Sequence, residues 1–190
     1  RFTTIYGDGI LTSAIGSHAV YSQALQGTEM SYVGISVKGW KDTTVPLEQQ
    51  HRTEWKSIKL YIPDPNVVDF RLFGAHTTSK WWYTNNYGGP GDFYPRDDKT
   101  SNLDISEVQK DDGGWYVMIS SKTPGSWSNM RYGSTRYLYV LYTLTLKEGH
   151  TLAELGISEG QTLTLSNTQV TFQGVGAEDL KVEELPNSVV

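Results

Sequence analysis

The side chains that could support acid–base or metal chemistry are few and scattered in this sequence. The four histidines are His18, His51, His76 and His150. They stand far apart and none has a partner at ligand spacing, so no histidine-based metal motif is indicated. Cysteine is absent, which excludes disulfides, thiolate metal sites and cysteine nucleophiles. The Walker A motif, GXSXG and a dinucleotide glycine fingerprint are also absent.

Carboxylates are available, but their pattern does not indicate catalysis. Asp97 and Asp98 follow an aromatic segment, and Glu54 and Glu107 lie in or near predicted strands. A glycosidase needs two carboxyl groups that face each other across a cleft, whereas charged residues in loops are usually solvated. We therefore expect no enzyme activity, and a small glycoside hydrolase is the third-ranked alternative.

One short stretch supplies several oxygen ligands. PRDDKTSNLD, residues 95–104, could form a loosely built Ca²⁺ site. It lacks the glycine and the terminal glutamate of an EF-hand, so a polar turn is the favoured interpretation. We expect no cofactor, with Ca²⁺ as the one ion to test.

Aromatic rings offer a more informative chemistry. The stretch WWYTNNYGGPGDFYP, residues 81–95, places six aromatics in fifteen positions of a chain that is 12% aromatic. Trp and Tyr present a flat apolar face with a polar edge. Sugars of β-linked polysaccharides likewise have apolar C–H faces and hydroxyl-bearing rims, so stacking flanked by polar hydrogen bonds is a matched way to bind them.

This stretch divides into a strand end and a loop. If residues 79–84 are extended, Trp81 and Tyr83 point one way and Trp82 the other, so at least one of them belongs to the core. The following glycines, proline and asparagines permit no regular strand. The loop so formed carries Tyr87, Phe93 and Tyr94. Alternatively, these aromatics fold back and close the end of the domain.

A second aromatic loop is predicted in KTPGSWSNMRYGSTR, residues 122–136, which contains Trp127 and Tyr132. Loops at one end of a β-domain converge in space and concentrate binding residues. We therefore expect the two aromatic loops to form one surface.

Tyrosines on strands define a competing surface. Tyr32, Tyr61, Tyr137 and Tyr139 have the outward parity of their strands. If these strands are neighbours, the tyrosines form a stripe, which Trp40 joins only if its strand continues through Gly39. The alternative is that another segment, such as the poorly patterned first thirty residues, covers this face. We rank the stripe below the loops.

The elements that must position these residues are mostly strands. Alternation with a period of two predicts strands at 31–40, 56–62, 67–73, 136–146, 161–167 and 168–174. Residues 114–120, GWYVMIS, are apolar on both faces, as in a central strand. Thr151 and Glu154 have capping-box spacing and Gly156 can end a helix, so one short helix is expected near 151–156. The predicted fold class is all-β: an antiparallel β-sandwich of jelly-roll type.

Length and charge bound the remaining possibilities. The 190 residues suit one domain, which we place at 1–184, with 185–190 as the start of a C-terminal linker. Because the chain opens without an initiator Met, we expect it to be covalently part of a larger multi-domain protein. The net charge of −5 argues against nucleic acid and anionic membranes as partners. No apolar run approaches the roughly 20 residues that span a bilayer, so a soluble protein is expected.

With a cysteine-free β-sandwich pattern and Trp and Tyr on its loops, the chain resembles the non-catalytic carbohydrate-binding modules of bacterial plant cell-wall degrading systems, including those of cellulosomes. The resemblance implies a secreted or cell-surface module that anchors a larger protein to β-glucan, with cellulose as the first candidate. It implies stacking by Trp81, Trp82, Tyr83, Tyr87, Tyr94, Trp127 and Tyr132, with Asn85, Asn86, Asp92 and Arg131 as polar partners. The second hypothesis is a protein–protein interaction module, such as a cohesin-like scaffold or adhesin domain, that uses the same aromatics as hot spots.

Overall fold

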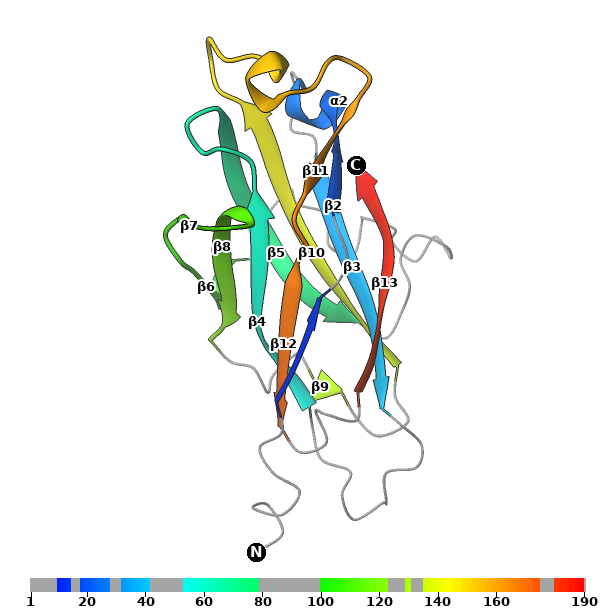
Figure 1. Cartoon of the computed structure of the whole chain (residues 1–190). Coiled ribbons are helices and arrows are strands. Elements are labelled where there is room, and N and C mark those ends of the chain that lie inside the picture. The colour runs from blue at the N-terminus through cyan, green and yellow to red at the C-terminus, as the bar shows by residue number, and fades with distance from the viewer. Residues whose placement is uncertain are drawn as a thin grey trace, which may run out of the picture.

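The computed structural model describes residues 10–14, 18–27, 32–41, 53–78, 100–122, 129–130, 135–174 and 180–189. These residues are mostly strands, and all the strand pairs are antiparallel. Figure 1 shows long strands running side by side between an upper and a lower end.

Two main sheets are present in the described residues. The larger has seven strands, with the main path β1 (Ile10–Ala14), β12 (Gln169–Gly174), β4 (Thr53–Ile62), β8 (Gly114–Ser121) and β6 (Leu103–Ile105). In addition, β7 (Gln109–Asp111) pairs with β8 and β9 (Asn129–Met130) pairs with β4. The smaller sheet has four strands in the order β13 (Leu180–Val189), β3 (Tyr32–Lys41), β10 (Thr135–Leu146) and β5 (Val68–Thr78). A separate two-stranded sheet consists of β2 (His18–Tyr21) and β11 (Thr162–Leu165).

The predicted strands are confirmed, and so is the alternation in β4 and β5. Ile58, Leu60 and Ile62 are buried on one side of β4, because every second side chain of a strand points to the same face. In β5, Val68 and Leu72 are buried while Asp69 and Arg71 are exposed.

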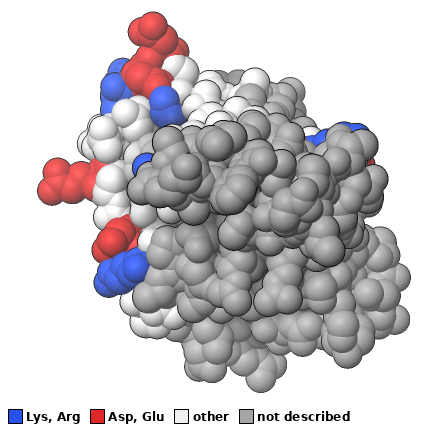
Figure 2. Space-filling model, turned by 90° about the horizontal axis from the view of Figure 1, so that it is seen from below, with Lys and Arg blue, Asp and Glu red and all other residues white. Residues whose placement is uncertain are grey.

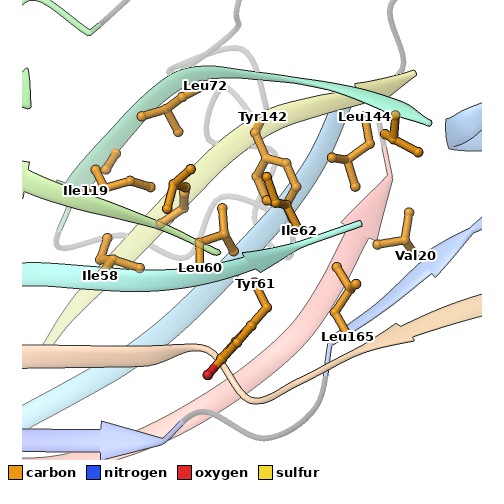
Figure 3. Packing of buried hydrophobic residues seen from close by; sticks show 14 of the residues in the cluster. Val20, Ile58, Leu60, Tyr61, Ile62, Leu72, Ile119, Tyr142, Leu144 and Leu165 are labelled. Carbon is orange, nitrogen blue, oxygen red and sulfur yellow. The ribbon is translucent and has the colours of Figure 1, made fainter. Parts of the chain in front are cut away.

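One hydrophobic cluster joins both main sheets and the β2–β11 pair (Figure 3). Its residues include Leu60 of β4, Ile119 of β8, Tyr142 of β10 and Val20 of β2. Each fully buried aliphatic side chain of this kind contributes about 1.5–3 kcal/mol to stability. This shared core fixes the positions of the strand ends from which the loops leave.

The helix expected near 151–156 is present as a 3₁₀ turn, η3 (Leu152–Leu155). The Thr151 backbone N–H donates to Glu154 Oε2 at 2.8 Å, and Gly156 ends the turn with φ 78°. A further short helix, α2 (Ser22–Leu25), was not predicted, and its Ala24 and Leu25 pack into the core.

Of the segment 185–190, which was expected to begin a linker, residues 185–189 belong to β13. Leu185 pairs with Ser36 and Ser188 with Gly34, and the register shifts between the two pairs. Pro186 lies within this irregularity, where its missing N–H costs no ladder hydrogen bond. The strand therefore continues through the proline of the segment that was expected to begin a linker.

Candidate functional site

The predicted binding residues lie outside the described part of the chain. They are Trp81, Trp82, Tyr83, Asn85, Asn86, Tyr87, Asp92, Tyr94, Trp127, Arg131 and Tyr132. Residues 95–99 of the candidate Ca²⁺ stretch also lie outside it. What the structure does describe is the set of strand ends that border both aromatic loops.

Those strand ends lie side by side. Leu103, which opens β6 after the first loop, pairs with Ser121, which closes β8 before the second. The Lys122 N–H donates to the Asn102 carbonyl at 2.8 Å, and Lys122 Nζ lies 3.7 Å from Asp104 Oδ1. The first loop, which follows β5 of the smaller sheet, thus joins the larger sheet next to the point where the second loop leaves it.

The second loop returns to the same end of the larger sheet. Within it, Asn129 and Met130 form β9, where Met130 pairs with Thr53, the first residue of β4. Because Ser57 pairs with Ser120, the start of β4 lies beside the end of β8. In Figure 1, β9 and the adjoining end of β4 lie at the lower end of the molecule.

The proposed tyrosine stripe does not form as one surface. Tyr61 is in β4 of the larger sheet, whereas Tyr32, Tyr137 and Tyr139 are in β3 and β10 of the smaller sheet. Tyr61 is also buried, with 7% of its surface exposed. Figure 3 shows its ring on the opposite side of β4 from Leu60 and Ile62, so the outward parity was right but the exposure was not.

A compact polar–aromatic cluster surrounds Tyr61. The Tyr61 hydroxyl donates to Asp111 Oδ2 at 2.8 Å, and Lys59 Nζ forms an ion pair with the same carboxylate. Lys59 Nζ also lies 4.3 Å from the centroid of the Tyr116 ring, a cation–π contact. The Tyr61 and Tyr116 rings meet edge to face at 5.7 Å. Tyr116 is half-buried, and its hydroxyl donates to Gln109 Oε1 at 3.2 Å.

The contacts within this cluster shift the pKa values of its titratable side chains. The hydrogen bond from Lys59 lowers the pKa of Asp111, and the bond to Asp111 raises the pKa of Lys59. Burial raises the pKa of Tyr61, so its hydroxyl is not activated as a base or nucleophile. The cluster is suited to positioning an aromatic ring rather than to proton transfer.

The β7–β8 turn covers Tyr61. The Gly113 N–H donates to Asp111 Oδ1 at 2.8 Å, and the Gly113 carbonyl accepts from Ser166 Oγ at 2.6 Å. A Cβ at Gly113 would lie 2.8 Å from the Tyr61 ring, so only glycine allows this approach. Tyr61 is therefore sealed off, while Tyr116 keeps part of its ring exposed.

The outward side of the smaller sheet is covered in part. Leu141 and Thr143, on the β10 face opposite Tyr142, are 0% and 4% exposed, and Phe73 of β5 is 4% exposed. This burial agrees with the alternative to the tyrosine stripe, in which another segment of the chain covers this face of the sheet.

The described residues contain no group of three or more His, Asp or Glu side chains that could hold a metal ion. His150 Nδ1 lies 3.1 Å from Glu154 Oε2, at the η3 turn.

In the view from below, acidic and basic side chains of described residues lie close together along one side (Figure 2). Within the same residues, no helix is long and apolar enough to cross a membrane.

Comparison of the chain with protein-family models, with curated proteins and with solved structures finds no match.

Proposed function

We propose that this chain is a non-catalytic carbohydrate-binding module that anchors a larger secreted or cell-surface protein to β-glucan, with cellulose as the first candidate. The observation that carries the proposal is the adjacency of the strand ends bordering both aromatic loops, with Leu103 paired to Ser121 and Lys122 bonded to Asn102. Loops that leave from adjacent strand ends can present their aromatics to one ligand.

The proposed architecture is a β-sandwich of jelly-roll type. Its support is the single hydrophobic cluster to which both main sheets contribute, together with antiparallel pairing throughout the described strands. Such a scaffold fixes the strand ends that border the two loops.

The proposal is tested on the loop tryptophans. Trp81→Ala, Trp82→Ala and Trp127→Ala should each abolish retention on insoluble cellulose and retardation in gels that contain soluble β-glucan. Tyr21→Ala is the matched control, because Tyr21 is an exposed aromatic (45%) on β2, paired with β11 rather than with a main sheet. Circular dichroism and thermal melting check that the variants are folded. Full retention by all three tryptophan variants would rule out the loop site.

One observation favours a protein partner as the second candidate. Ile105, the last residue of β6, and Val108, between β6 and β7, are 44% and 41% exposed. Exposed aliphatic side chains at a sheet edge can contribute to a protein interface. If no polysaccharide in a broad panel retards the protein, this candidate becomes the better one.

A further inference from the structure

A transverse row of small polar residues crosses the larger sheet. The strand registers align Thr12 of β1 with Thr171 of β12, Thr171 with Ser57 of β4, Ser57 with Ser120 of β8, and Ser120 with Asp104 of β6. We call these five residues the hydroxyl row. Neighbouring strands are about 4.8 Å apart, so the row spans roughly 20 Å.

The hydroxyl row lies on the sheet face opposite the core. Four of its members are next in sequence to buried core residues: Ser57 to Ile58, Thr171 to Val170, Ser120 to Ile119 and Asp104 to Leu103. Alternation along a strand therefore turns the row outward. Thr12 and Asp104 are exposed, and the three central residues are half-buried.

The row is continuous with the loop end of the sheet. Ser120 and Asp104 directly adjoin the Ser121–Leu103 pair that borders both aromatic loops. The row therefore lies directly beside the strand ends where the first loop joins the larger sheet and the second loop leaves it.

The chemistry of the row fits a sugar chain. Hydroxyl groups both donate and accept, as sugar hydroxyls do, and Thr12 Oγ1 already bonds Thr171 Oγ1 at 3.0 Å. The acid of the row, Asp104, is paired with Lys122, and Lys59, on the next outward position of β4 after Ser57, is paired with Asp111. These paired charges favour an uncharged ligand over an acidic one.

Building on the proposed function, we propose that the hydroxyl row is a second part of the binding surface, on which a single uncharged glycan chain lies across the strands. A single chain has free hydroxyls for the row to bond, whereas chains inside crystalline cellulose bond to one another. The row thus selects individual soluble chains over crystal surfaces.

The test measures affinity for soluble hydroxyethyl cellulose by gel retardation, with charged carboxymethyl cellulose and microcrystalline cellulose as comparisons. Ser57→Glu and Thr171→Glu should weaken binding to hydroxyethyl cellulose roughly tenfold or more. Thr12→Glu, at the exposed end of the row, should weaken it as well and is the variant least able to disturb folding. Thr164→Glu is the matched control, because Thr164 is an exposed strand threonine of β11, outside the larger sheet.

Two results overturn the inference while leaving the proposed function intact. One is wild-type affinity for hydroxyethyl cellulose in the folded Ser57, Thr171 and Thr12 variants. The other is the wrong ligand preference in the wild-type protein, shown either by binding to microcrystalline cellulose but to neither soluble cellulose, or by tighter binding to carboxymethyl than to hydroxyethyl cellulose. Failure of the wild-type protein to bind any glycan would instead overturn the proposed function, and this inference with it.

Discussion

The side chain of Tyr61 points outward from β4 but is covered by another part of the same sheet. The β7–β8 turn covers the ring, and Asp111 accepts hydrogen bonds from the Tyr61 hydroxyl, the Gly113 N–H and the Lys59 ammonium. The side chain of its neighbour Tyr116 points to the same face of the sheet but is only half-buried. Strand parity predicts the direction of each tyrosine, but not whether a distant turn will cover it.

The close approach of Gly113 to Tyr61 gives a residue-scale prediction. Gly113→Ala should lower the free energy of unfolding by about 1–3 kcal/mol, because the new Cβ would lie 2.8 Å from Cε1, Cζ and Oη of Tyr61. Urea denaturation measures the loss. In a Tyr61→Leu background the penalty should shrink, and equal penalties in both backgrounds would show that the ring is not its cause.

The pKa shifts of the same cluster predict how stability depends on pH. The lowered pKa of Asp111 contributes stability that is present above its ordinary value of 3.8 and is lost as the pH falls. The raised pKa values of Tyr61 and Lys59 contribute stability that is present below their ordinary values of 10.0 and 10.5 and is lost as the pH rises.

Urea titrations at about pH 3, 7 and 10.5 check both arms. The stability difference between wild type and Asp111→Asn should be largest at neutral pH and should shrink in acid. Tyr61→Phe should reduce the loss of stability at alkaline pH. A constant difference in the free energy of unfolding between wild type and Asp111→Asn across the acid range would show that the pKa of Asp111 does not cause the loss of stability in acid.

At the scale of elements, the sequence predicted the strands with clear alternation and missed those without it. The strands β3, β4, β5, β8, β10, β11 and β12 carry regular apolar positions. The missed strands β6, β7 and β9 have two or three residues, too few for a period. The strands β1 and β2, also missed, have five and four residues in the poorly patterned first thirty, and β13 contains charged residues and Pro186. Pairing with an established neighbour, which is a tertiary effect, decides these elements.

The extent of β13 can be tested by truncation. Ending the chain at Glu184 removes the recorded pairs of Leu185, Ser188 and Val189 with β3. The Tm should fall by roughly 2–4 °C for each kcal/mol of stability lost. Removing only Val190 keeps every recorded β13 pair and is the control. An unchanged Tm for the chain ending at Glu184 would mean that residues 185–190 behave as a linker after all.

At the scale of the whole molecule, strand order and register create surfaces that the sequence cannot show. Ser57, Ser120 and Thr171 are ordinary outward residues when each strand is considered alone. Only the registers of the strands align them into the hydroxyl row beside the loop end. The aromatic residues of the loops could be selected from sequence by composition and parity, and their role stays a prediction.

The central claim is that the folded chain binds an uncharged β-glucan. Its most direct test is isothermal titration of the wild-type protein with soluble β-glucans and cello-oligosaccharides, beside a panel of unrelated polysaccharides. The account predicts saturable binding of β-glucan that is insensitive to salt, because no net charge is exchanged. The absence of heat and of gel retardation with every glycan, from protein shown to be folded, would contradict it.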